Sequence, residues 1–120
     1  PMSFYPRSLK SDWYMGCVCD SIFSALEGTK GWTKYSFGIE CERNAYVETF
    51  EQCQKIVKEN DLKPDAMLQA LSDFHDTLPL LPKPPFFSFA RWFHDPLEAR
   101  EKAIIIAFDL VDGISKRYLS

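Results

Sequence analysis

Apolar residues recur every three or four positions over most of this chain, which is the period of an amphipathic α-helix. The first such segment opens at Ser11-Asp12. Its apolar positions are spaced four apart: Tyr14, Val18, Ile22 and Leu26. Gly28 suits the position just after a helix, where the backbone often turns left-handed. We therefore expect the first helix to end at Gly28 and to follow an irregular arm over residues 1–10.

A second helix is predicted from about Ala45 to Asn60, with Asn44 as its N-cap. Its apolar stripe comprises Tyr46, Phe50, Cys53 and Val57. The segment before it, residues 28–43, includes a stretch that alternates apolar and polar residues as a strand does, but no second strand of similar quality is available to pair with it. We expect an ordered loop there, with or without a short helical turn.

A third helix is predicted between Pro64 and Pro79, because proline suits the first turn of a helix and cannot continue one. Its expected buried positions are Met67, Leu68, Leu71, Phe74 and Leu78. A stiff Pro-rich stretch, residues 79–85, follows and is predicted to cross the surface in an extended form.

The last helix has the clearest start in the chain. Asp95 can cap it, Pro96 suits its first position, and Glu98 can complete a capping box. The helix should run to about Tyr118. Residues 103–108 are apolar on every side, so this helix should be the central one. Asp109 interrupts its apolar surface, and an unpaired carboxylate would be costly to bury there. One interpretation is that Asp109 reaches solvent or pairs with a lysine or arginine. The other is that it lines a polar pocket or a site for a binding partner.

Taken together, these segments predict an all-α fold: a compact single domain over residues 1–120, with four to five helices and a long, largely buried C-terminal helix. Apolar residues make up 46% of the chain and aromatic residues 15%, which is enough for a core. No apolar run is long enough to span a membrane. No signal-peptide pattern opens the sequence, and we interpret Pro1 as a remnant ahead of Met2; the alternative is a start left by removal of a leader.

The charge distribution points to a class of partner. Residues 40–76 carry nine acidic and four basic side chains, a net charge of −5, although the whole chain carries only −3. A negative face of this kind repels nucleic acid and attracts cationic surfaces. The sequence therefore predicts a protein partner with a basic surface, no nucleic acid and no membrane, and it indicates no cofactor.

Four cysteines are too sparse for a disulfide scaffold. We expect them to be reduced and buried in a cytoplasmic protein; one or two bridges in a periplasmic protein are the alternative. The Cys17-Val18-Cys19 spacing does not suit zinc, because side chains two residues apart on a helix diverge.

An aromatic block follows the Pro-rich stretch: Phe86, Phe87, Phe89, Trp92 and Phe93. It can belong to the core, cover a small-molecule pocket, or form a protein-binding surface. Trp92 beside Arg91 has the composition of an interaction hot spot.

The leading functional hypothesis is a small acidic protein that binds another protein and catalyses no reaction. Within that class we expect an inhibitor or immunity protein, of the antitoxin type, that covers the surface of a basic toxin such as a nuclease. The expected partner-binding residues are Glu40, Glu42, Glu48, Glu51, Arg91 and Trp92.

Two alternatives stay open. Two Phe-His-Asp tripeptides suggest a small metal-dependent hydrolase that uses His75, Asp76, His94 and Asp95. The other alternative is a homodimeric structural subunit that buries the aromatic block between two copies of the chain.

Overall fold

The structure, a computed structural model, describes residues 12–78 and 96–119, and most of them are helical. Four α-helices are present in these ranges: α1 (Asp12–Thr33), α2 (Glu40–Glu59), α3 (Pro64–Thr77) and α5 (Leu97–Leu119). A short 3₁₀ turn, η3 (Lys34–Ser36), follows α1. The predicted all-α bundle with a long C-terminal helix is confirmed.

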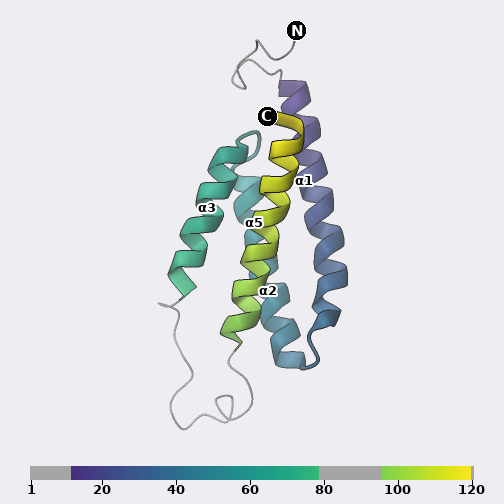
Figure 1. Ribbon diagram of the computed structural model, residues 1–120, viewed down its shortest axis with the longest axis vertical. Helices are drawn as coiled ribbons and strands as arrows, with labels where there is room; N and C mark the ends of the chain where they lie inside the picture. Colours follow the sequence, from purple (N-terminus) through teal and green to yellow (C-terminus); the bar gives the residue numbers. More distant parts are fainter. Residues whose placement is uncertain (1–11, 79–95, 120) are drawn as a thin grey trace.

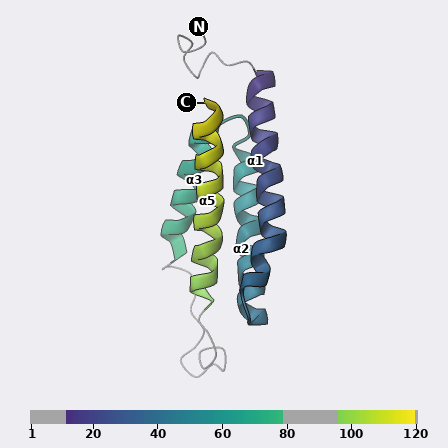
Figure 2. The same ribbon diagram turned by 45° about the vertical axis from the view of Figure 1, so that its right-hand side comes forward.

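Consecutive helices alternate in direction along one common axis (Figure 1). As a result α2 and α5 run the same way, and they lie side by side at the centre of the bundle (Figures 1 and 2). Helices α1 and α3 flank this central pair on opposite sides. Helix α5 packs against each of the other three helices, as its apolar sequence predicts.

Small side chains allow the two central helices to approach closely. Six of the seven buried positions of α5 are spaced four apart and begin with alanines: Ala99, Ala103, Ala107, Val111, Ser115 and Leu119. Helix α2 has a matching buried series of Ala45, Thr49, Cys53 and Val57. Short side chains at this spacing leave shallow grooves in which the ridges of the partner helix fit.

Larger side chains fill the rest of the core. Tyr46 and Phe50 of α2 are fully buried, as predicted, and their ring centroids lie 5.4 Å apart. The ring of Phe37 packs on Tyr46 at 5.1 Å, so the residue that follows η3 belongs to the core. Helices α1 and α3 contribute Ile22, Leu26, Met67 and Leu71 to the same cluster.

The connection between the first two helices differs from the sequence prediction. Helix α1 passes through Gly28 and ends only at Thr33, and no glycine has a positive φ in the described residues. Helix α2 begins at Glu40, so Asn44 lies inside the helix and does not cap it. The predicted loop over residues 28–43 is therefore mostly helical, and only residues 37–39 link η3 to α2.

The physical reason is tertiary. Burial of Phe37 against Tyr46 fixes the turn between the helices nine residues after Gly28, and this packing outweighs the local preferences of Gly28 and Asn44. Glu40 and Glu42 in the first turn of α2 favour the positive end of the helix dipole.

The later helices agree closely with their predictions. Pro64 occupies the start of α3, which ends at Thr77, and α5 continues through Gly113 to Leu119. Four predicted features lie outside the described residues: the arm over residues 1–10, the Pro-rich crossover over residues 79–85, the aromatic block, and the cap at Asp95.

Candidate protein-interaction site

Large apolar side chains are exposed where α1 leads into α2. Trp32, near the end of α1, has 83% of its surface exposed, and Tyr35 in η3 has 69% exposed. Ile39, just before α2, is also exposed. We call these three residues, together with the pocket beside them, the α1–α2 corner.

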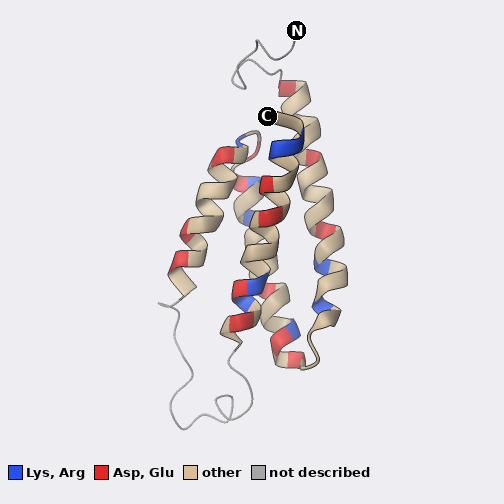
Figure 3. Cartoon of the chain, in the orientation of Figure 1, with Lys and Arg blue, Asp and Glu red and all other residues tan. Residues whose placement is uncertain are grey.

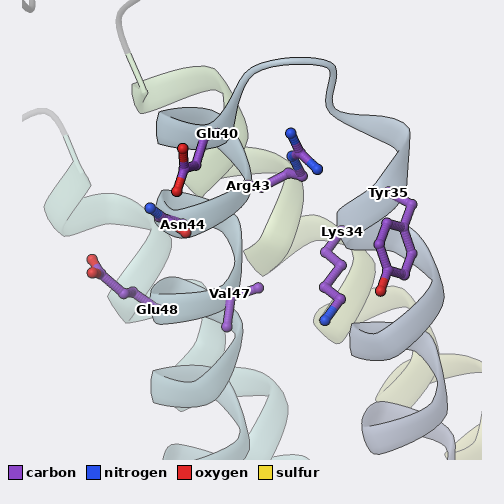
Figure 4. A pocket seen from close by; sticks show the side chains of 7 residues that line it. All are labelled: Lys34, Tyr35, Glu40, Arg43, Asn44, Val47 and Glu48. Atoms are coloured by element: carbon purple, nitrogen blue, oxygen red, sulfur yellow. The ribbon is translucent and has the colours of Figure 1, made fainter.

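The pocket has a volume of about 460 Å³. Two elements line it, with Lys34 and Tyr35 on η3 and five residues on α2: Glu40, Arg43, Asn44, Val47 and Glu48. Figure 4 shows Glu40, Asn44 and Glu48 on successive turns along one side of α2, with Lys34 and Tyr35 across from them. The pocket therefore lies between two elements that are joined by the short link over residues 37–39.

Charges of both signs line this pocket, and its two cations are not neutralised by described residues. The Arg43 side chain forms no ion pair with any described residue, and its buried Nε has no hydrogen-bond partner there. The ammonium of Lys34 lies 5.0 Å from the ring centroid of Tyr35. The guanidinium of Arg43 can donate hydrogen bonds to an anionic or carbonyl group of a binding partner.

The carboxylates at this site come from α2. Glu48 lies 3.7 Å from Nη2 of Arg100, so part of its charge is already compensated. Glu40 and Glu51 are exposed, and their spacing along the helix places them on the same face as Glu48. Glu42 is half-buried and lies about 200° around the helix from Glu40. The structure thus brings together three of the four predicted glutamates and separates Glu42 from them.

The other predicted partner residues, Arg91 and Trp92, lie outside the described residues. Trp32 and Tyr35 were not among the predicted partner-binding residues, because their segment, residues 28–43, was predicted to form a loop. The sequence does contain one indication of their role. Each is a large aromatic residue with a lysine close by, in a stretch that has no apolar stripe to bury it.

A second acidic surface extends along α3. Asp65, Asp73 and Asp76 are all exposed, and their spacing places them on one face of this helix, which contains no lysine or arginine (Figure 3). The Gln69 amide donates a hydrogen bond of 2.9 Å to Asp73. The net negative charge predicted for residues 40–76 therefore lies on the α2–α3 hairpin.

The histidine–aspartate pairs of the alternative hypothesis are only partly described. His75 Nδ1 lies 3.9 Å from Asp76 Oδ1, and His75 Nε2 lies 3.8 Å from Glu101 Oε1. His94 and Asp95 fall outside the described residues. Within the described part of the chain, no three histidine, cysteine or acidic side chains are arranged to hold a metal ion.

The cysteines differ in part from their prediction. All four are free thiols, but only Cys19 and Cys53 are buried, whereas Cys17 and Cys41 are exposed. Burial raises the pKa of the Cys53 thiol to about 12, because the interior disfavours the thiolate. Burial also raises the pKa of Cys19. The two buried thiols therefore act as small apolar core residues.

No helix in the described ranges combines the length and the apolar character needed to cross a bilayer. Comparison of the chain with protein-family models, with curated proteins and with solved structures finds no match. The function is therefore argued from the geometry of the molecule.

Proposed function

We propose that this protein acts by binding another protein, with the α1–α2 corner as its principal contact. The observation that carries the proposal is the exposure of Tyr35, which lines a pocket with Arg43, and of Trp32 one helical turn before it. Large exposed apolar groups gathered in one place are typical of interaction sites. Tryptophan, tyrosine and arginine are also the residues that most often dominate the binding energy of an interface.

The partner that we propose presents a basic surface. Glu40 and Glu48 line the pocket of the α1–α2 corner, Glu51 is exposed on the same face of α2, and the α2–α3 hairpin carries a net charge of −5. Complementary charge of this kind speeds association and sets specificity more than it raises affinity. A nuclease has a cationic surface for its phosphodiester substrate, and an acidic protein of this size can cover that surface. Within the binding class we therefore propose an inhibitor or immunity protein for a basic toxin.

The anchoring role of the aromatic residues can be tested with a matched control in the same helix. Trp13 is 77% exposed at the opposite end of α1 from Trp32. The purified wild-type protein, immobilised, is used to capture its partner from an extract of the source cells, and the interaction is then reconstituted with the purified partner. The Trp32→Ala/Tyr35→Ala variant should lose at least about tenfold in affinity, since hot-spot truncations cost about 2 kcal/mol or more.

The Trp13→Ala control should bind as the wild type does. Equal losses in both variants, or full affinity in the double variant, would contradict the assignment of the α1–α2 corner. Circular dichroism of each variant establishes that the helices are intact.

The charge of the partner is tested separately by association kinetics. Reversal of Glu40 and Glu51 to lysine should slow association and flatten its dependence on salt, because electrostatic steering acts on the encounter. A control with the same change in net charge reverses Asp12 and Asp20, which are exposed on α1 outside the α2–α3 hairpin, and it should associate as the wild type does. Faster association of the Glu40/Glu51 variant would indicate an acidic partner and would overturn the basic-partner proposal.

A further inference from the structure

A second pocket lies between α3 and α5, which run side by side (Figures 1 and 2). Its volume is about 320 Å³, at the lower end of the range of about 300 to 1,000 Å³ for small-molecule sites. Eight residues line it: Leu71, Ser72 and His75 on α3, and Glu101, Ile104, Ile105, Phe108 and Asp109 on α5. The α5 residues follow the spacing of one helix face.

The pocket has an apolar floor that reaches the core. Leu71 and Ile104 are fully buried core residues, and Phe108 is half-buried beside them. Ile105 is 43% exposed and adds apolar surface at the edge of the pocket. An apolar molecule in this pocket would cover Ile105 and contact the Phe108 ring.

The rim of the pocket is negatively charged. Glu101 and Asp109 are exposed carboxylates two helical turns apart, with Ile105 between them. Asp109 forms no ion pair or hydrogen bond with any described residue. His75 Nε2, at 3.8 Å from Glu101, is the one basic group among the residues that line the pocket. The pocket therefore offers an apolar surface next to the carboxylate of Asp109, which no described residue neutralises.

We propose that the pocket between α3 and α5 binds a small organic cation, namely a primary ammonium group carried on an apolar body. The apolar body would occupy the floor formed by Leu71, Ile104 and Phe108. The ammonium group would lie beside the carboxylate of Asp109, which it can reach with a charge-assisted hydrogen bond. Glu101, two helical turns away, would add to the negative potential of the rim. The face of the Phe108 ring provides a second attraction for a cation. This site is separate from the α1–α2 corner, so it can be tested whether or not the proposed protein partner exists.

Three probes that share a phenyl body separate the contributions of charge and apolar contact. Phenethylamine, 2-phenylethanol and phenylacetate are titrated into the ¹⁵N-labelled full-length protein, and the amide resonances are followed by NMR. We expect saturable shifts with phenethylamine at Ser72, His75 and Ile105. The alcohol should bind at least about tenfold more weakly, because it lacks the charge-assisted bonds, and the carboxylate should be repelled.

Variants then test the assigned residues. Asp109→Asn combined with Glu101→Gln should weaken phenethylamine by about tenfold or more and leave 2-phenylethanol unchanged. Asp20→Asn combined with Glu59→Gln makes the same change in net charge at exposed positions outside the pocket, and it should bind as the wild type does. Ile105→Ala should weaken the amine and the alcohol alike, since it removes apolar contact only.

Equal affinity for the amine and the alcohol would overturn the proposal, as would shifts that map outside the pocket. Undiminished binding of phenethylamine to the Asp109→Asn/Glu101→Gln variant would do the same. Shifts of the same resonances on dilution of the ligand-free protein would show that a second copy of the chain covers Ile105, and the small-cation site would then be rejected.

Discussion

Arg100 of α5 donates a hydrogen bond of 3.1 Å from Nη1 to the hydroxyl oxygen of Thr49 on α2. The same guanidinium approaches Glu48, one residue earlier, through Nη2 at 3.7 Å. Thr49 is one of two polar residues buried among the described residues, and Arg100 reaches it from the rim of the core. This contact joins the first turn of α5 to the middle of α2.

Replacing Thr49 with valine keeps the shape of the side chain and removes the acceptor for Arg100. We expect a loss of about 1 kcal/mol in the free energy of unfolding, because Arg100 is partly exposed and water can replace part of the bond. Thr49→Ser, which keeps the hydroxyl and loses a methyl group, tests the alternative that packing is what matters. Urea denaturation measures both variants, and a valine variant as stable as the wild type would show that the hydrogen bond contributes nothing.

The close approach of α2 and α5 leads to a prediction at Ala103. This residue is fully buried in the alanine series of α5, so Ala103→Leu adds a bulky branched side chain where the helices meet. The expected cost is about 1 to 3 kcal/mol of stability from overpacking, measured by urea denaturation. Ile105→Leu, two residues along on the exposed face of α5, should change the stability by less than about 0.5 kcal/mol. Unchanged stability of the Ala103→Leu variant would mean that the central helices are farther apart than the structure has them.

The first helix was predicted to end at Gly28, but in the structure it continues through this residue to Thr33. Gly28 lies inside α1 with a negative φ, and a Cβ atom built there meets nothing within 4 Å. Gly28→Ala should therefore stabilise the protein by about 0.5 to 1 kcal/mol, since alanine favours a helix interior. If Gly28 instead ended the helix in a left-handed conformation, the same change would destabilise the protein. Thermal unfolding followed by circular dichroism distinguishes the two outcomes by sign.

Side-chain periodicity was sufficient to predict the buried face of α2. The spacing of Tyr46, Phe50, Cys53 and Val57 is dictated by the 3.6-residue period, and all four are fully buried. Helix boundaries were harder to predict, because the turn between α1 and α2 depends on a contact of Phe37 with a residue in the next helix. Local preferences, such as that of glycine for a helix end, are weak compared with burial of an aromatic ring.

The candidate site could be predicted only in part, for a related reason. The face shared by Glu40, Glu48 and Glu51 follows from their spacing on one helix and needs no tertiary information. The pocket between Lys34 and Arg43 forms because two elements meet across a short link, and no pattern within one segment encodes that meeting. The same holds for Asp109, whose place beside a pocket depends on α3.

The buried thiol of Cys53 leads to a prediction about alkaline stability. Its pKa is about 12 in the folded protein, against an ordinary value of 9.0 in the unfolded chain. Because the folded pKa is the higher one, the neutral thiol contributes its full stabilisation below pH 9 and loses it as the pH rises from 9 to 12. The loss should approach about 1.4 kcal/mol for each pH unit inside this window, or about 2 kcal/mol at about pH 10.5.

The Cys53→Ala variant isolates this contribution. It should be less stable than the wild type by a constant amount up to about pH 8.5, because a small cavity replaces the sulfur atom. Above about pH 9 the difference should shrink by about 1 to 2 kcal/mol by about pH 10.5, since the variant has no thiol to ionise at this position on unfolding. Urea denaturation at half-unit steps between about pH 7 and 10.5 measures the two curves.

Cys17→Ala, at an exposed cysteine, serves as the control and should run parallel to the wild type. Parallel curves for Cys53→Ala as well would show that the Cys53 thiol reaches water in the folded protein and that the core is open at that position.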